Sequence, residues 1–230
     1  MRLVIVLSVF LSCFFGSGVE AAAPKKQPVK RKTPMKQAPL IVVDAGHGGH
    51  DLGTNSNKTP IYEEKTLTLQ TAKLVNENLK LLGYRTKMVR TDDTFIELKK
   101  RAEIANRCGA RLFVSVHYNS APKPASHGIE VFYYKAKGEC PRASKSRKLA
   151  DSVLAETIRL TEAKNRGVKH GNFAVIRETE IPAVLIEAGF LTNADERKKI
   201  MGKAYQKKIA WGIARGIDEY IKGSKTAPTS

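Results

Sequence analysis

The sequence VVDAGHGGHD, residues 42–51, places two histidines and three glycines directly after an apolar run. A turn needs one glycine or two, so three glycines around His47 indicate a tightly bent backbone that points an imidazole at something. The overlapping stretch LIVVD, residues 40–44, is a short apolar run typical of a strand buried on both faces of a parallel sheet. The segment therefore predicts a buried strand that ends in a functional turn.

Beyond this strand, apolar runs and helical patterns alternate along the chain. Five further strands are expected, at residues 84–90, 111–117, 128–134, 172–178 and 183–189. Helices are expected at residues 64–83, 95–109 and 146–163, with closing helices over 195–221. This alternation predicts a single α/β domain from about residue 40 to about residue 222, with a largely parallel sheet.

The first 21 residues have the composition of a secretory signal peptide. Arg2 is followed by an apolar run over residues 3–15 and then by small residues, with cleavage expected near Ala21. The apolar run is shorter than an uncleaved membrane anchor requires. We therefore expect export, to the periplasm or the cell envelope.

Residues 22–39 are interpreted as a basic, proline-rich linker, and residues 223–230 as a flexible tail. Within the linker, residues 24–39 hold four prolines, six Lys or Arg and no acid, a composition that cannot form a packed element. A solvated tether is the favoured interpretation of this leader. The alternative is electrostatic contact of the leader with an anionic wall or membrane surface.

The formal net charge of +18 implies anionic partners. Expected export argues against nucleic acid, as does the lack of the interleaved aromatic and basic residues that stack bases. A monomer is expected.

The spacing of Cys108 and Cys140 matches no zinc motif. An oxidising compartment permits a disulfide between them. The favoured interpretation of Cys108, however, is a small buried hydrophobic residue.

Four polar residues follow or open the expected elements. His47 follows the first strand, His117 ends the third, Glu187 lies near the end of the last, and Glu64 opens the first helix. Ligands in open α/β sheets sit outside the carboxyl ends of the strands, so these residues are expected to converge. Two imidazoles and a carboxylate form a catalytic zinc set that leaves one coordination position open for water.

Each of these residues also has a simpler explanation when it is taken alone. His47 suits a glycine-rich turn, His117 suits a polar strand end, and an acid such as Glu64 is favourable in the first turn of a helix. Glu187 is harder to explain, because VLIEAGF buries a carboxylate in an apolar run, which is costly unless the group is partnered or functional. Four such residues at one edge of the sheet nevertheless favour a catalytic metal site. Glu187 would take a proton from the water that occupies the open coordination position.

The chain also resembles a known family over residues 40–221. The motifs that carry the resemblance, in the family's order, are DAGHGGHDLG, the Glu64-Lys65 step, LKKRAEIAN, SVHYNS, GIEVFYY and NRGVKHGNFAVIRETEIPAVLIEAGFLTN. They are similar to those of the zinc-dependent N-acetylmuramoyl-L-alanine amidases of the amidase-3 family. The resemblance implies a twisted, mostly parallel six-stranded sheet flanked by helices.

By this resemblance His47, Glu64 and His117 are the Zn²⁺ ligands and Glu187 is the catalytic base. Glu63 is the alternative third ligand; Glu64 is preferred because the family's glutamate directly precedes a lysine or a similar residue. The implied reaction is hydrolysis of the peptidoglycan amide between N-acetylmuramic acid and L-alanine. Zinc would polarise the carbonyl and activate water, and Glu187 would pass a proton to the leaving amine.

Three further residues are candidates for substrate binding. Asn119 is placed to donate a hydrogen bond to substrate or to hold the site loop, with simple solvent-facing polarity as the alternative. Arg166 and Lys169 are candidates to pair with carboxylates of the stem peptide, and a solvated basic face explains them equally well. His50 is a candidate neighbour of the metal ligands, although it is not preferred as one.

Some relatives carry a long inserted helix between the fourth strand and the next core helix, and it plugs the zinc site until an activator removes it. Here only residues 135–146 separate these elements, which is too short for a connection and a plug. The sequence therefore predicts a site that is open without an activator.

Three other functions stay open. The first is a zinc peptidase that cuts bonds within the stem peptide. The second is a wall-binding module without catalysis. The third is an added serine activity at SAPK, residues 120–123, where Ser120 and Lys123 fit the S-x-x-K pattern of penicillin-binding proteins; a chain this rich in lysine shows that pattern by chance.

Overall fold

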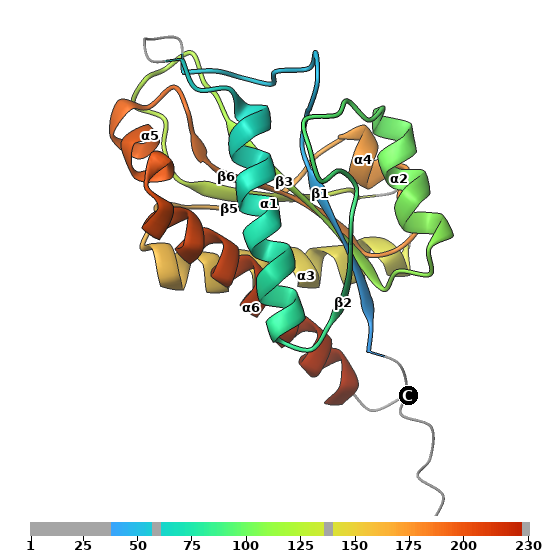
Figure 1. Cartoon of the computed structure of the whole chain (residues 1–230). Helices are drawn as coiled ribbons and strands as arrows, with labels where there is room; N and C mark the ends of the chain where they lie inside the picture. Colours follow the sequence, from blue (N-terminus) through green and yellow to red (C-terminus); the bar gives the residue numbers. More distant parts are fainter. Residues whose placement is uncertain (1–37, 57–60, 136–139, 227–230) are drawn as a thin grey trace, which may run out of the picture. The chain divides into compact units, whose positions relative to one another are not determined.

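The computed structural model describes residues 38–56, 61–135 and 140–226 (Figure 1). The expected signal peptide and all but the last two residues of the expected linker lie outside these ranges. The strands are β1 (Leu40–Ala45), β2 (Arg85–Met88), β3 (Leu112–Asn119), β4 (Ile129–Tyr133), β5 (Asn165–His170) and β6 (Ala183–Phe190). The helices are α1 (Glu64–Leu81), α2 (Leu98–Arg107), α3 (Pro141–Thr161), α4 (Ala174–Arg177), α5 (Ala194–Met201) and α6 (Lys203–Thr226).

The strands form one six-stranded sheet in the order β2-β1-β3-β6-β4-β5. Strands β2, β1, β3 and β6 run in the same direction, whereas β4 is antiparallel to β6 and parallel to β5. The first four strands therefore point their carboxyl ends to one edge, and β2 and β5 are the two edge strands. The expected α/β fold, with a mostly parallel six-stranded sheet flanked by helices, is confirmed.

Side chains of alternate residues enter two apolar layers, one on each face of the sheet. Ile41 and Val43 belong to the layer that contains residues of α1, α3 and α6, whereas Val42 belongs to the layer on the side of α2 and α4. Figure 1 shows α3 and α6 side by side on one side and α2 near α4 on the other. Strand β1 is thus buried on both faces, as its apolar run predicts.

The prediction of a strand at residues 172–178 is wrong. The fifth strand is Asn165–His170, and Ala174–Arg177 is the short helix α4. Val175 and Ile176 are buried in the α2–α4 layer, and a short apolar run of this kind does not distinguish a strand from a helical turn. The true strand escaped notice because an edge strand needs no continuous apolar run.

Two helices extend beyond the expected limits. Helix α3 begins at Pro141, a residue favoured in the first helical turn because it needs no hydrogen bond there. The connection from β4 is therefore residues 134–140, of which 136–139 lie outside the described ranges. Helix α6 continues to Thr226, so residues 223–226 of the expected tail are helical.

Two negative findings concern the described residues only. None of their helices combines the length and the apolarity that crossing a membrane requires. Cys108 and Cys140 are both free and partly buried, so no disulfide joins them in this structure.

Two buried arginines bind the backbone that follows β1. Arg90 donates from Nε to the carbonyl of Ala45 (2.9 Å) and from Nη2 to that of Gly46 (2.7 Å). Arg101 donates from Nη1 to the carbonyl of Ala45 and from Nη2 to that of His47, both at 2.7 Å. Three successive carbonyls are therefore fixed by two guanidinium groups, which have the rigid donor geometry for this task.

Arg101 also forms a buried ion pair. Its Nη1 lies 2.9 Å from Oδ1 of Asp44, and both side chains are almost fully excluded from solvent. Ser115 donates to the other oxygen of Asp44 at 2.7 Å. Removing one member of such a pair leaves an uncompensated charge in the interior, which is strongly destabilising.

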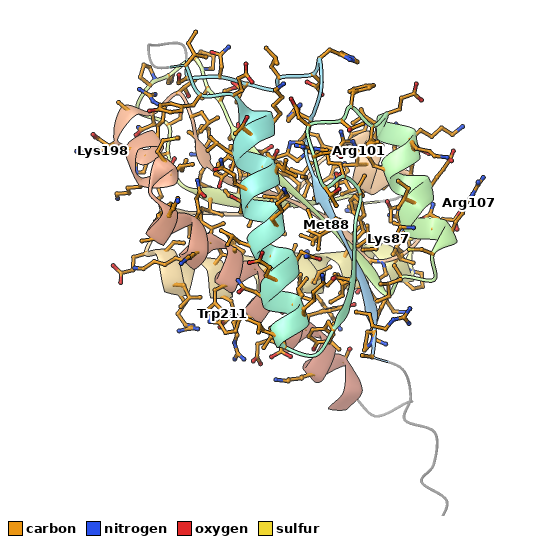
Figure 2. The ribbon with its side chains drawn as sticks, viewed as in Figure 1. Lys87, Met88, Arg101, Arg107, Lys198 and Trp211 are labelled. Carbon is orange, nitrogen blue, oxygen red and sulfur yellow. The ribbon has the colours of Figure 1, made fainter. Side chains whose placement is uncertain are left out.

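We predict that Arg101→Met lowers the free energy of unfolding by about 3–5 kcal/mol, measured by urea denaturation. The matched control is Arg107→Met on the same helix, because Arg107 is exposed and extends away from the domain at the end of α2 (Figure 2). The control should change stability by less than about 0.5 kcal/mol. Equal losses in both variants would contradict a special role for the buried pair.

Candidate metal centre

The four residues expected to converge do meet at one edge of the sheet. His47 follows β1, His117 lies on β3 and Glu187 on β6, and Glu64 is the first residue of α1. His117 and Glu187 are register partners on adjacent strands. The parallel strand order thus brings together residues that are up to 140 positions apart in sequence.

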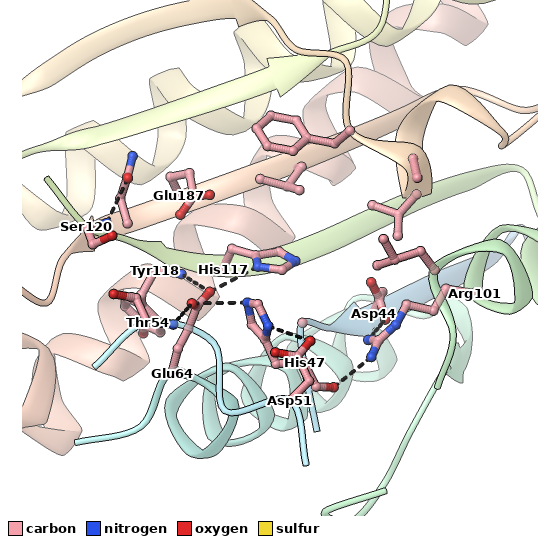
Figure 3. Close-up of a pocket in the computed structure, with 17 residues that line it drawn as sticks. Asp44, His47, Asp51, Thr54, Glu64, Arg101, His117, Tyr118, Ser120 and Glu187 are labelled. Carbon is pink, nitrogen blue, oxygen red and sulfur yellow. Dashed lines mark hydrogen bonds and ion pairs between the residues drawn. The ribbon is translucent and has the colours of Figure 1, made fainter. Parts of the chain in front are cut away.

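The carboxylate of Glu64 faces both imidazoles and contacts each of them (Figure 3). Its Oε2 is 3.0 Å from Nε2 of His47, and its Oε1 is 3.0 Å from Nδ1 of His117. The two rings meet edge to face with centroids 4.9 Å apart. Each of the three residues offers one donor atom, and these atoms lie within 4.8 Å of one another. Two nitrogens and one oxygen at this separation suit a three-ligand zinc site.

Backbone N–H groups hold Glu64 in this position. The amide of Thr54 donates to Oε2 at 2.9 Å, and the amide of Tyr118 donates to Oε1 at 3.0 Å. The neighbouring Glu63 points elsewhere: its side chain is 38% exposed and lies 3.7 Å from Nζ of Lys65. The structure therefore places Glu64, and not Glu63, beside the histidines.

The charges of this group shift its pKa values. Burial raises the pKa of Glu64, but hydrogen bonds and charges from His117 and His47 outweigh burial and hold it well below its usual range. Burial lowers the pKa of His47, but the carboxylates of Glu64 and Asp51 outweigh burial and raise it above its ordinary value. A metal ion bound between these residues would supply a positive charge for the buried carboxylate of Glu64.

Asp51 is a site residue that the sequence analysis missed. Its Oδ2 lies 2.9 Å from Nδ1 of His47, and its Oδ1 accepts from the amide of Gly53 at 3.1 Å. A metal-binding histidine commonly donates its second ring N–H to such a carboxylate, which fixes the tautomer and the ring orientation. The neighbouring His50 is exposed and lies against Phe95, with ring centroids 4.1 Å apart. The sequence did contain a signal for Asp51, because this acid follows His47 by four positions in the same turn.

Two glycines leave room for the ligand side chains. A Cβ atom at Gly46 would lie 2.5 Å from Nε2 of His117 and 2.6 Å from Nδ1. A Cβ atom at Gly53 would lie 2.6 Å from Oε2 of Glu64 and 2.7 Å from Cδ2 of His47. All four distances are too short for real contacts, so any side chain at these positions would displace a candidate ligand. His47 itself has φ 60°, a left-handed conformation that few residues other than glycine adopt.

Glu187 differs from Glu64 in having a free oxygen. Its Oε2 is buried and makes no hydrogen bond within the described part of the chain. Burial raises the pKa of Glu187 well above its usual range, and the nearby charges of Glu64 and Glu130 add to that shift. In Figure 3 Glu187 lies near His117, with no dashed contact to another side chain. It is therefore a carboxyl group available for proton transfer.

A cavity of about 310 Å³ is lined by these residues. The candidate metal ligands and Glu187 contribute polar lining. The apolar lining, here called the apolar wall, comes from α2, from α4 with the residue before it, and from β6; its members are Leu98, Phe173, Ala174, Val175 and Leu185. A substrate in this cavity would meet both polar groups and hydrocarbon.

The three residues proposed for substrate binding converge on Glu130, which the sequence analysis did not single out. Asn119 donates from Nδ2 to Oε1 of Glu130 at 2.8 Å. Arg166 and Lys169 both donate to Oε2, at 2.7 and 2.5 Å. The signal was available, because Glu130 interrupts the apolar run GIEVFYY just as Glu187 interrupts its own.

Ser120 also lines the cavity, directly after β3. Its amide donates to Oδ1 of Asn119 at 2.8 Å. Both Ser120 and Lys123 are exposed, and no hydrogen bond joins their side chains in this structure. The pair therefore lacks the contact by which a lysine would activate a serine nucleophile.

The comparisons with known proteins agree with this geometry. Residues 41–219 match the family described as N-acetylmuramoyl-L-alanine amidase. The chain is 35% identical over 190 residues to the N-acetylmuramoyl-L-alanine amidase CwlM of Bacillus licheniformis, covering 81% of this chain and 70% of that protein. It is 34% identical over 208 residues to the uncharacterized protein YqiI of Bacillus subtilis, covering 90% and 94% respectively.

The solved structures place the fold in the same group. The crystal structure of N-acetylmuramoyl-L-alanine amidase from Clostridium difficile 630 superposes with a TM-score of 0.76 at 39% identity, covering 81% of this chain and 98% of that one. The family match spans most of the chain and includes His47, Glu64, His117 and Glu187. The chain belongs to the N-acetylmuramoyl-L-alanine amidase family.

Proposed function

We propose that this protein is a zinc hydrolase that cleaves the amide bond between N-acetylmuramic acid and L-alanine in peptidoglycan. The observation that carries the proposal is that His47, Glu64 and His117 share one cavity with Glu187, whose buried Oε2 has no hydrogen-bond partner among the described residues. The names of its relatives supply the substrate, and the chemistry of the donor set supplies the reaction class.

The donor set fits zinc, and the surrounding groups support it. Zinc readily takes two imidazoles and a carboxylate and keeps an open position. Asp51 would orient His47, while the amides of Thr54 and Tyr118 would orient Glu64. When bound, zinc would polarise the scissile carbonyl and increase the acidity of the attacking water.

Glu187 is proposed as the group that moves the proton. Its Oε2 would accept the proton of the attacking water and then donate it to the nitrogen of the leaving amine. Two features support this role: the oxygen has no competing hydrogen bond in the described chain, and burial keeps its pKa high enough to hold a transferred proton. The apolar wall would exclude bulk water and accommodate the methyl groups on both sides of the scissile bond.

We propose that the site works without an activator. The seven residues 134–140 between β4 and α3 cannot contain both a connection and a helix long enough to cover the cavity. Among the described residues, those that line the cavity belong to the core domain. Purified, zinc-loaded protein should therefore digest peptidoglycan with no second protein present.

Export to the periplasm or the cell envelope is part of the proposal. It rests on the signal-peptide composition of residues 1–21 and on the location of the substrate. The basic linker, residues 22–39, would tether the domain or contact an anionic wall or membrane surface. The catalytic domain, residues 40–222, is proposed to act as a monomer.

One prediction of the proposed function concerns the bond that is cut. Digestion of intact wall fragments should release stem peptides with a free L-alanine amino terminus, identified by mass spectrometry, and chelation should abolish the release. Fragments cut within the stem peptide would instead support a peptidase. Binding without any release by metal-loaded protein would support a wall-binding module, and acylation of Ser120 by labelled penicillin would support the serine activity.

A second prediction separates the base from the ligands. Glu187→Ala should keep about one zinc per chain while hydrolysis falls by about 10²–10⁴-fold, the usual effect of losing a general base. His117→Ala should lose zinc and activity together, because two remaining ligands hold zinc poorly. Metal analysis and a turnover assay on the same preparations decide the matter. Loss of zinc from Glu187→Ala would make Glu187 a ligand and overturn its assignment as the base.

A third prediction tests the close approach of the backbone at Gly46 to the imidazole of His117. Gly46→Ala should weaken zinc binding by at least about tenfold, because the added methyl group displaces the imidazole of His117. The control is Gly223→Ala, where nothing lies within 4 Å of the added methyl group. Zinc titration compares the two variants, and circular dichroism shows whether each is folded. Unchanged zinc affinity in a folded Gly46→Ala protein would contradict the ligand role of His117.

A further inference from the structure

Glu130 is a buried carboxylate to which the proposed reaction assigns no role. Its side chain is 6% exposed, yet it accepts hydrogen bonds from Asn119, Arg166 and Lys169. Burial raises the pKa of Glu130, but Lys169 and Arg166 outweigh burial and hold it below its usual range. Glu130 is therefore a charged anchor for two cations on the edge strand β5.

One carboxylate does not neutralise two cations, so the cluster keeps an excess positive charge. The side chain of Lys169 is 40% exposed, and its ammonium uses one donor on Glu130, which leaves others directed to solvent. The guanidinium of Arg166 is held over the ring of Phe190, 4.7 Å from its centroid, and is 27% exposed. Both cations are thus positioned in advance and still able to bind an anion.

The cluster lies next to the cavity. Glu130 is the register partner of Glu187 on the antiparallel strand, and directly opposed residues share a face of the sheet. Asn119 lines the cavity and donates to Glu130. Across the sheet the order is therefore the metal ligands at β1 and β3, the proposed base on β6, Glu130 on β4 and the two cations on β5.

This order gives the substrate a direction. Glu187, which would protonate the leaving amine, stands between the metal ligands and the cluster. The amine belongs to the peptide, so the peptide would extend from Glu187 toward β4 and β5. We propose that Arg166 and Lys169, held by Glu130, bind a free carboxylate of the stem peptide beyond L-alanine, so that the enzyme discriminates against peptides in which this carboxylate is an amide.

This inference rests on the proposed function, because it takes the stem peptide as the leaving group. An amide in place of the carboxylate would lose the charge-assisted hydrogen bonds and would direct its own N–H donors at two cations. Half-exposed partners make the effect modest. We expect kcat/KM to be about tenfold higher for the carboxylate form.

The test uses two wall-derived substrates that differ only in this group, which is a free carboxylate in one and an amide in the other. Lys169→Gln should lower kcat/KM for the carboxylate substrate about tenfold more than for the amide, mainly through KM. This variant leaves Glu130 paired with Arg166 and Asn119, so it does not create a buried unpaired charge. Lys164→Gln is the matched control, because it removes the same charge from an exposed residue just before β5 and should keep the preference.

The outcomes are distinguishable. Equal cleavage of both substrates by the wild-type protein, or an undiminished preference in Lys169→Gln, overturns the inference and leaves the proposed hydrolysis intact. If Lys169→Gln lowers kcat/KM equally for both substrates, the cluster only stabilises the structure, and the inference is overturned as well. If neither substrate is cleaved, the proposed function fails; calorimetric affinities for the two free stem peptides then still confirm or overturn the preference without turnover.

Discussion

The site depends on two guanidinium groups that bind three successive carbonyls after β1. Arg90 and Arg101 together engage the carbonyls of Ala45, Gly46 and His47. The left-handed backbone of His47 is unfavourable by itself, and these charge-assisted hydrogen bonds compensate for it. The orientation of the first imidazole, and hence the place of any metal, follows from donors buried beneath the turn.

The environments of two glutamates separate their roles. Glu64 has hydrogen-bonding partners on both oxygens, which favours a permanent negative charge and a fixed position. Glu187 lies on the strand next to His117, and one of its oxygens is buried and has no partner in the part of the chain that the structure describes. In the proposed reaction, one carboxylate stabilised as an anion and one inclined to hold a proton would let a single site supply both a ligand and a proton carrier.

The sequence predicted the parts of the fold that depend on continuous apolar runs, and it predicted that the polar residues near the ends of those runs lie close together. Strands β1, β3 and β6 are buried on both faces, so their sequences are mostly apolar, and the polar residues His47 just after β1, His117 within β3 and Glu187 within β6 are conspicuous. Strand β5 has no such pattern, because it lies at an edge and holds a glycine. Asp51 and Glu130 each carried a signal in the sequence, but their partners could not be read from it, because the contacts with His47 and with Arg166 form only in the folded turn and between the paired strands.

The two edge strands have a property in common that bears on how copies of this protein behave at high concentration. Strand β2 carries Arg85 and Lys87, both exposed, and β5 carries Arg166 and Lys169. Open sheet edges invite a strand from another molecule, and positive charge along an edge opposes that association. Since both edges bear the same sign, two sheets that meet edge to edge repel each other, and the fold carries its own protection against aggregation.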